Sequence, residues 1–244
     1  MISIVIPAHN EEGVIGETLK RLREGAQAAG VPVELILSDD GSTDKTAEVA
    51  AQFADKVVRY EGQLPKTIGA ARNRGARLAR GDIFLFLDSD VWLRDPKVFF
   101  PAIVRHFENP NLAAMTVSMR VEPTGETRAD RAVLWCFDTY FRVANNVFHW
   151  GLTHGKCMIV RAAAFRAVGG IDEHIVASED ADLFMRLSKV GRIILDPSMR
   201  VYFSGRRAHA MGWPKLLWQW TLNGIWIVLF KRSYSQSWAR AKGS

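Results

Sequence analysis

In the N-terminal part of the chain, short runs of consecutive apolar residues alternate with helical patterns, and this alternation limits the possible folds more than any other feature. The four runs are residues 3–6, 34–37, 56–60 and 83–87. Apolar runs without polar alternation are typical of strands buried on both faces. Helices must cover those faces, and apolar residues at helical spacing predict them at residues 11–23 and 67–78. The alternation predicts a parallel sheet with right-handed crossovers.

Beyond residue 96 the apolar pattern is less regular, but it still predicts both helices and strands. It predicts a helix at residues 97–107, a strand at 113–117, a long aromatic helix within 128–150 and a strand at 157–160. We find no linker rich in Pro, Gly or Ser and no repeat. We therefore expect the second half to extend the same sheet, giving an α/β fold with a mostly parallel central sheet flanked by helices.

The composition supports a packed core and an anionic partner. Hydrophobic residues make up 48% of the 244 residues and charged residues 24%, a balance that excludes a disordered or collagen-like chain. A net charge of +6 is compatible with nucleic acid, an anionic membrane surface or a phosphate-bearing substrate. Because the chain contains no recognised nucleic-acid-binding module, we expect no nucleic-acid partner.

The two cysteines and the N-terminus bear on the compartment. Cys136 and Cys157 are too few for a disulfide framework or a zinc cluster, and two buried thiols suit a reducing environment. The opening residues lack the basic region and cleavage site of a signal peptide. We therefore expect a cytoplasmic location.

Two carboxylates, Asp88 and Asp90, emerge from a buried strand where ligands bind in open α/β sheets. Hard divalent cations such as Mg²⁺ or Mn²⁺ prefer such oxygens and complete their shell with water and substrate phosphates. An Asp pair at a strand end can also simply cap the next turn. A second acidic turn, Asp39-Asp40-Gly41-Ser42, follows a neighbouring strand and favours the metal-binding interpretation, because its carboxylates can bind a base and a ribose.

Several arginines are placed to meet phosphate. Arg72, Arg74, Arg77 and Arg80 lie on or just after the helix before the Asp88 strand, and a solvated helix face is the expected role for most of this group. Arg206 and Arg207 follow a strand predicted at residues 200–203 and can hold a diphosphate or an anionic acceptor.

Four motifs in order resemble those of family 2 glycosyltransferases with the GT-A fold: SIVIPAHNEE (3–12), SDDGSTDKT (38–46), GAARNRGARLARGD (69–82) and LDSD (87–90). The likeness continues through GKCMIVRAAAFRAVGGIDE (155–173) and SEDADLFMRL (178–187). It implies a GT-A domain over residues 1–210, with a nucleotide-binding half at 1–95 and an acceptor and catalytic half at 96–210. The Q-x-x-R-W motif of processive members is absent, which argues against long-chain polymer synthesis.

The resemblance implies a role for each matching residue. Asp180 is implied as the catalytic base, with Glu179 beside it binding acceptor or orienting the site. Asp88 and Asp90 are implied to hold metal and ribose, with Asp90 the direct ligand, and His209 to complete the metal shell. The residues implied to hold the nucleoside are Pro7, Ala8, Asn10, Glu12 and Asp40. The acidic Glu179-Asp180 pair would also suit the N-terminal turn of the helix that follows it.

The C-terminal segment, residues 211–244, concentrates tryptophan. Trp213, Trp218, Trp220, Trp226 and Trp238 are five of the chain's eight. The apolar stretch at 216–230 is shorter than the ~20 residues that span a bilayer. Flanking cations favour an amphipathic helix at the membrane surface over a core-covering helix or an oligomer contact. The aromatic helix within 128–150, which carries Trp135, Phe137, Tyr140, Phe141, Phe148 and Trp150, is expected to fill the core instead.

Three functions remain open. The first is an inverting, metal-dependent glycosyltransferase that is peripheral to the cytoplasmic face of a membrane. It would move one sugar from a nucleotide diphosphate sugar, with UDP favoured, to a hydroxyl of a glycan or lipid-linked acceptor. The second is a polyprenyl-phosphate glycosyltransferase. The third is a nucleotide-sugar-binding module without catalysis, against which the intact acidic residues speak.

Overall fold

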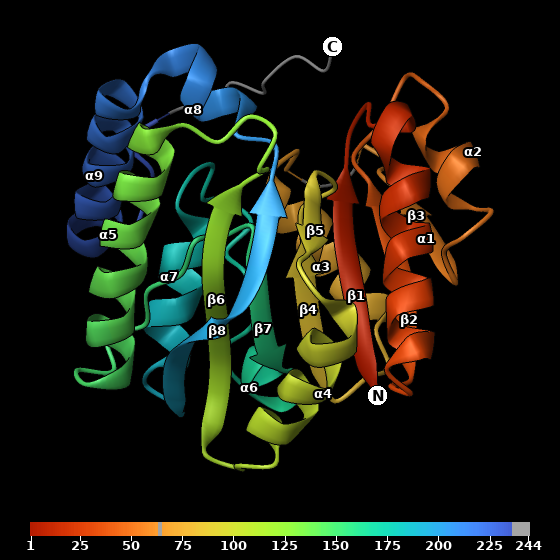
Figure 1. Ribbon diagram of the computed structural model, residues 1–244, viewed down its shortest axis with the longest axis horizontal. Helices are drawn as coiled ribbons and strands as arrows, with labels where there is room; N and C mark the ends of the chain where they lie inside the picture. Colours follow the sequence, from red (N-terminus) through yellow and green to blue (C-terminus); the bar gives the residue numbers. More distant parts are fainter. Residues whose placement is uncertain (63–64, 236–244) are drawn as a thin grey trace.

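The structure is a computed structural model that describes residues 1–62 and 65–235. Its described strands form one eight-stranded sheet in the order β3-β2-β1-β4-β7-β6-β8-β5 (Figure 1). The strands are β1 (Ile2–Ala8), β2 (Val33–Asp39), β3 (Lys56–Arg59), β4 (Ile83–Leu87), β5 (Val91–Leu93), β6 (Leu112–Val121), β7 (Cys157–Arg161) and β8 (Arg192–Phe203). The sheet takes strands from both halves of the chain, as the sequence predicts.

Helices cover both faces of the sheet, as its buried strands require. The described helices are α1 (Glu12–Ala28), α2 (Thr46–Ala50), α3 (Ile68–Leu78), α4 (Pro96–Phe107), α5 (Arg128–Asn146), α6 (Ala162–Ala167), α7 (Glu179–Leu187), α8 (Arg206–Met211) and α9 (Trp213–Phe230). Helices α1, α4 and α5 lie on one side of the sheet, and α3, α6 and α7 lie on the other (Figure 1). Apolar side chains of the first three helices and of α9 pack on one face, and those of α3, α6 and α7 pack on the other. Two hydrophobic clusters result, one on each side of the sheet.

Strand direction changes at β4. Strands β3, β2, β1 and β4 pair parallel to one another, which confirms the prediction for the first half. β7 pairs antiparallel with β4 and with β6, and β6 then pairs parallel with β8. The carboxyl end of β4 therefore meets the amino end of β7, and residues next to these two ends become neighbours.

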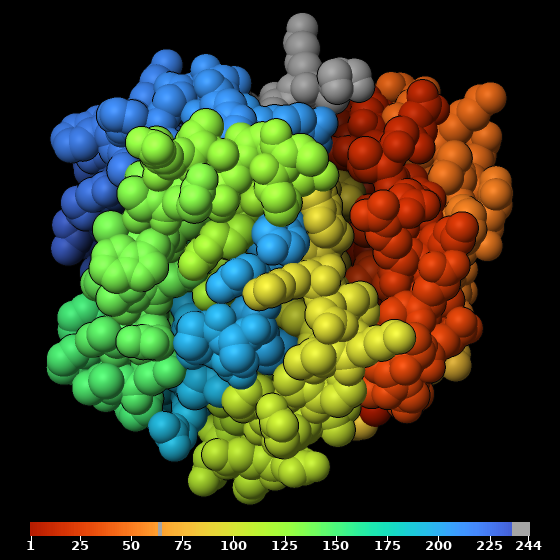
Figure 2. All heavy atoms as spheres, viewed as in Figure 1, coloured from red at the N-terminus to blue at the C-terminus, as the bar shows by residue number. Residues whose placement is uncertain are grey.

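Side chains in β1 alternate between the two faces. Ile4 and Ile6 join the cluster under α1, whereas Val5 joins the cluster under α3. On the face shown in Figure 2, α1 and α5 cover the two sides, and part of β8 reaches the surface between α5 and α4. Gly75 in α3 lets that helix approach β1 closely, because a Cβ there would overlap the side chain of Val5.

The prediction that the aromatic helix within 128–150 fills the core is wrong for most of its large side chains. α5 begins with a capping box between Thr127 and Asp130 and buries only a narrow stripe that includes Leu134. Side chains outside that stripe or just beyond the helix are exposed: Trp135, Tyr140, Phe148 and Trp150. Cys136 is exposed as well, so only Cys157 fits the expectation of two buried thiols.

α9 begins at Trp213, three residues before the predicted apolar stretch, and ends at Phe230 as expected. It packs on α5 through Phe137 and Trp220, whose ring centroids are 5.7 Å apart. Among the residues that the structure describes, none of the helices has both the length and the apolar character needed to cross a bilayer. Trp238 lies outside the described residues.

Candidate active site

The acidic pair lies at the carboxyl end of β4, where the sequence predicts it. β4 ends at Leu87, and Leu87 pairs with Cys157 at the start of β7. The backbone N–H of Asp88 then donates to the carbonyl of Lys156, with N and O 3.1 Å apart. Asp88 and Asp90 remain 20% and 17% exposed, so a ligand can reach both carboxylates.

Arg72 on α3 connects the acidic pair to the second acidic motif. Its Nη2 donates to Asp88 Oδ1 at 3.0 Å and to the carbonyl of Gly155 at 2.9 Å. Its Nη1 donates to Glu179 Oε1 at 2.6 Å. The guanidinium is buried, so these are charge-assisted bonds in a region of low dielectric. Arg72 therefore brings together α3, the residue that follows β4 and the start of α7.

Glu179 and Asp180 begin α7 and lie beside this guanidinium. Burial raises the pKa of Glu179 to about 7, with the charge of Asp180 adding to the rise and the charge of Arg72 opposing it. Burial also raises the pKa of Asp180, and Arg72 again opposes the rise. General bases work best when their pKa lies near the working pH, so this environment suits a base.

Lys156 holds the two carboxylates of the acidic pair together. Its Nζ lies 3.3 Å from Asp88 Oδ2 and 3.0 Å from Asp90 Oδ1. Asp90 Oδ2 accepts a hydrogen bond of 2.7 Å from Ser204 Oγ, just after β8. Burial opposes ionisation of Asp90, but the charge of Lys156 and the Ser204 hydroxyl lower its pKa overall.

These two carboxylates fit a shared cation. One ammonium nitrogen reaches an oxygen of each, so a single cation between them contacts both. Carboxylate oxygens are also the ligands that Mg²⁺ and Mn²⁺ prefer. Within residues 1–62 and 65–235, three or more His, Cys, Asp or Glu side chains do not gather into a metal cage. The pair therefore suits an ion that takes its remaining ligands from water and substrate phosphate.

The residues predicted to hold the nucleoside lie at the adjoining ends of β1 and β2. Pro7 and Ala8 form the buried end of β1. Asn10 accepts a 2.8 Å hydrogen bond from the N–H of Thr43, and Glu12 accepts one of 2.9 Å from the N–H of Lys45. In this structure these two side chains brace the loop after β2, and their role in nucleoside binding stays a prediction.

Asp40 is paired with a second buried arginine of α3. Nη2 of Arg74 lies 3.1 Å from Asp40 Oδ1, and its guanidinium lies over the ring of Tyr60, 5.4 Å from the centroid. The expectation that most of these four arginines are solvated is therefore wrong for Arg72 and Arg74, whereas Arg77 and Arg80 are exposed. Both buried arginines have carboxylate partners from distant parts of the chain, which offset the cost of burying their charge.

Of the residues predicted after β8, Arg206 lies nearest the acidic pair. Its Nη2 is 4.0 Å from Asp90 Oδ2, and its Nε donates to Ser204 Oγ at 3.2 Å. Arg207 donates to Gln219 of α9 at 3.3 Å. His209 is hydrogen-bonded to Asp130 of α5 through its Nε2, at 2.9 Å. A metal role for His209 would require this bond to break, and it stays a prediction.

Sequence reasoning missed two members of the site. Lys156 directly precedes a strand, where a lysine gives no sequence signal of a site, and only the pairing of β4 with β7 places it beside Asp88. Burial raises the pKa of Glu11, while the charge of Arg206 lowers it and the charge of Asp90 raises it, so Glu11 interacts with both residues of the site. Its position in the Asn10-Glu11-Glu12 string was the available signal.

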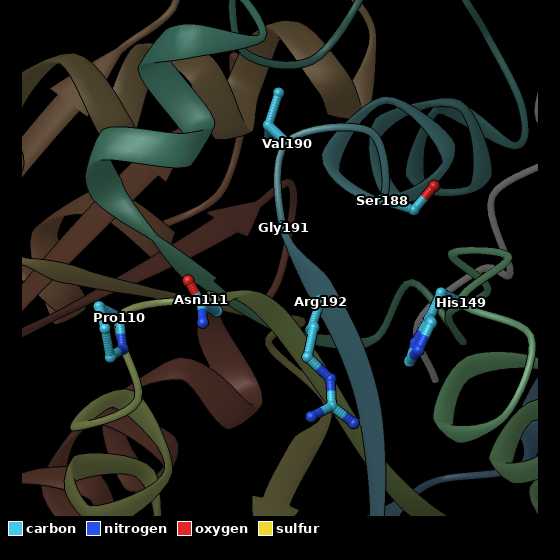
Figure 3. Close-up of a pocket in the computed structure, with 7 residues that line it drawn as sticks. All are labelled: Pro110, Asn111, His149, Ser188, Val190, Gly191 and Arg192. Carbon is cyan, nitrogen blue, oxygen red and sulfur yellow. The ribbon is translucent and has the colours of Figure 1, made fainter.

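A pocket lies away from these residues. It is lined by Asn111 just before β6, Arg192 at the start of β8 and His149 after α5, among others (Figure 3). Asn111 and Arg192 adjoin the amino ends of β6 and β8, whereas Ser204 and Arg206 follow the carboxyl end of β8. The pocket is therefore separate from the acidic site.

The fold is that of the GT-A glycosyltransferases. A mannosyltransferase from Pyrobaculum calidifontis, solved with GDP-Man and Mn²⁺, matches with a TM-score of 0.65 and 18% identity over 89% of this chain and 59% of that chain. Glucosyl-3-phosphoglycerate synthase from Mycobacterium tuberculosis, solved with Mn²⁺, UDP-glucose and phosphoglyceric acid, matches with a TM-score of 0.59 and 21% identity, covering 94% of this chain and 78% of that one. The chain belongs to glycosyl transferase family 2, whose family model matches residues 3–169.

Curated relatives are similar over different lengths. Succinoglycan biosynthesis protein ExoA of Rhizobium meliloti is 30% identical over 219 residues, which cover 86% of this chain and 65% of the relative. An undecaprenyl-phosphate 4-deoxy-4-formamido-L-arabinose transferase of Edwardsiella ictaluri is 28% identical over 174 residues, covering 68% of this chain and 48% of the relative. The chain therefore spans less than two thirds of the length of these relatives.

Proposed function

We propose that this family 2 glycosyltransferase transfers a single sugar, with inversion, from a nucleotide diphosphate sugar to a hydroxyl of a glycan or lipid-linked acceptor. The observation that carries the proposal is the position of Arg72, which binds Asp88 on one side and Glu179 on the other. The proposed donor-binding pair and the proposed base, the half-buried Asp180 that follows Glu179, thereby belong to one cluster of charged residues. UDP is the favoured nucleotide, and Mg²⁺ or Mn²⁺ the proposed cation.

In the proposed reaction the chain's residues supply a base and positive charge. Asp180 accepts the proton of the acceptor hydroxyl as that oxygen attacks the anomeric carbon, and its raised pKa strengthens it as a base. Arg206 and Arg207 neutralise the diphosphate that leaves on the opposite side. Asp88 and Asp90, with His209 as a further proposed ligand, would hold a divalent cation, which would stabilise the negative charge of the same leaving group.

In the same proposal, residues at the ends of β1 and β2 bind the nucleoside. Pro7 and Ala8 offer backbone at the end of β1, and Asp40 offers a carboxylate at the end of β2. Asn10 and Glu12 hold the loop after β2 in place through its backbone N–H groups. This arrangement agrees with the general position of ligands beyond the carboxyl ends of parallel strands.

Transfer to a polyprenyl phosphate is the alternative that a specific observation favours, since some relatives are named as undecaprenyl-phosphate transferases. Such an acceptor is already ionised, so a base matters much less. Asp180→Asn separates the two functions. Near-complete loss of transfer with donor binding intact supports a hydroxyl acceptor, whereas retained transfer supports a phosphate acceptor.

Donor identity is tested by thermal stability. A donor that binds only the folded protein raises the unfolding temperature, so UDP-, GDP- and dTDP-sugars are compared with and without Mn²⁺. The proposal expects stabilisation by one nucleotide class, dependent on Asp88 and Asp90. Binding without hydrolysis or transfer across a broad acceptor panel would instead indicate a non-catalytic nucleotide-sugar-binding module.

We also propose that α5 and α9 form a surface that contacts the cytoplasmic face of a membrane. Exposed aromatic and aliphatic side chains on or next to these helices support this proposal: Trp135, Tyr140, Phe148, Trp150, Trp218, Val228, Leu229 and Phe230. Exposed cations accompany them: Arg128, Arg142, Lys215, Lys231 and Arg232. Aromatic rings at headgroup depth beside cations that face lipid phosphate are the usual composition of an interfacial surface.

A further inference from the structure

The position of Lys156 is set by the sheet. Its carbonyl accepts the N–H of Asp88 across the β4 and β7 pairing, so its backbone is fixed beside the acidic pair. Its ammonium contacts one oxygen of Asp88 and one of Asp90, and it lies 5.4 Å from the centroid of the Phe203 ring. The side chain keeps 29% of its surface exposed, which leaves it a path out of this position.

All four oxygens of the acidic pair have partners within the protein. Asp88 Oδ1 binds Arg72, and Asp90 Oδ2 binds Ser204. The remaining two oxygens, Asp88 Oδ2 and Asp90 Oδ1, both bind the ammonium of Lys156. A divalent ion that bridges the pair must therefore take the oxygens that Lys156 holds, and like charges exclude both cations from one position.

We propose that Lys156 is a built-in counter-cation that competes with a divalent ion for Asp88 and Asp90. The inference rests on the proposed function, because it takes this pair as the cation site of the donor complex. A lysine has a flexible stem and a compact charge, so it can turn from the carboxylates to a donor phosphate. The free protein then binds a divalent ion weakly, and nucleotide and ion bind more tightly together than apart.

The test measures Mn²⁺ binding by the full chain without nucleotide, using the electron paramagnetic resonance signal of free Mn²⁺. Lys156→Met removes the charge at similar length, and Lys156→Arg keeps it. Lys56→Met is the matched control, because Lys56 forms a half-buried ion pair with Glu34 in another part of the sheet. We expect Lys156→Met to bind Mn²⁺ about tenfold or more tightly than wild type, within the range of typical coupling between sites. The Lys156→Arg and Lys56→Met variants should bind Mn²⁺ as weakly as wild type does.

Two results overturn the inference: Mn²⁺ affinity that is unchanged or weaker in Lys156→Met, or affinity in Lys156→Arg that rises as much. If Lys156→Met does not fold, Lys156→Gln removes the same charge with a polar side chain. The proposed function fails separately. A gain of Mn²⁺ affinity in a protein that binds no nucleotide sugar upholds the competition and contradicts the function. Metal-stimulated transfer with unaltered Mn²⁺ affinity in Lys156→Met upholds the function and overturns the competition.

Discussion

Gly155 lies so close to Asp180 that the first residue has no room for a side chain. A Cβ atom on Gly155 would overlap Oδ2 of the carboxylate and lie 3.0 Å from its Cγ. Gly155 also has a φ of +74°, in the region that favours glycine, and its carbonyl accepts a hydrogen bond from Arg72. The loop before β7 therefore holds the proposed base against the acidic pair through close backbone approach.

Gly155→Ala is expected to impair transfer far more than folding. The new methyl group displaces Asp180 from its position, and loss of a positioned base typically costs about 10²–10⁴ in rate. The positive φ adds about 1–2 kcal/mol of backbone strain. Steady-state kinetics and urea unfolding measure the two effects.

Gly169→Ala is the matched control for that substitution. Gly169 has a φ of +78° but nothing within 4 Å of an added Cβ. It should therefore lose a similar amount of stability and keep its activity. Equal activity losses in the two variants would mean that backbone strain, and not the displacement of Asp180, is responsible.

Arg72→Met is expected to destabilise the protein strongly. Arg72 is only 2% exposed, and its removal leaves the buried carboxyl group of Glu179 without its counter-charge, whereas Asp88 keeps Lys156 as a partner. Breaking one side of a buried ion pair typically costs about 3–5 kcal/mol. Arg77→Met, on the same helix, removes a guanidinium that is 55% exposed and should cost at most ~1 kcal/mol. Urea unfolding at pH 7 compares them, and similar losses would contradict a structural role for the Arg72 network.

Glu179 is expected to make the protein less stable as the pH rises. Its pKa is about 7 in the folded protein, against 4.5 for an ordinary solvated glutamate, so between these values the folded state holds a proton that the unfolded state has lost. Stability falls with pH wherever the folded state binds more protons. The free energy of unfolding should therefore fall from about pH 4.5 to about pH 7, and Glu179→Gln should reduce this slope.

Urea unfolding at several pH values measures that slope, with Glu17→Gln as control. Glu17 is exposed and pairs with Arg21 one turn along α1, where an ion pair contributes little. The control should keep the wild-type slope. A wild-type slope retained in Glu179→Gln would show that other groups, such as Asp180, hold the proton.

Much of the first half of the fold was predictable because its strands are buried on both faces. A strand such as Ile83–Leu87 has no polar residue to interrupt its pattern, and its observed bounds equal the predicted ones. β5, at Val91–Leu93, was not predicted, because three residues show no periodicity and its pairing with β8 joins distant parts of the chain.

The roles of the charged residues were harder to predict than the strands. A solvated helix face is the usual place for arginine, but Arg72 and Arg74 are buried, and each pairs with a carboxylate far along the chain, 107 and 34 positions away. Apolar spacing along α5 likewise predicts a helix and one packed face, yet it does not reveal that Trp135 lies outside that face. In each case tertiary contacts decide the outcome, and local pattern contains no information about them.

The exposed face of α9 is expected to bind anionic vesicles. Trp218 is 66% and Leu229 65% exposed, and Lys231 and Arg232 follow the helix. A double substitution, Trp218→Ser with Leu229→Ser, should greatly reduce co-sedimentation with vesicles that contain phosphatidylserine, because the apolar contribution to binding is lost. High salt should weaken wild-type binding, since the cationic contribution is screened.

Val98→Ser serves as the control for this surface. Val98 is 62% exposed but lies on α4, away from α9, so its loss removes a similar apolar side chain from a different part of the surface. The control should bind vesicles as wild type does, and all three proteins should show the same helix content. If wild type fails to bind vesicles, or if the double variant binds them equally well, the apolar face of α9 makes a contact other than with lipid. That contact would be with a second copy of the chain if the wild-type mass in solution rises with protein concentration and the double substitution abolishes this rise.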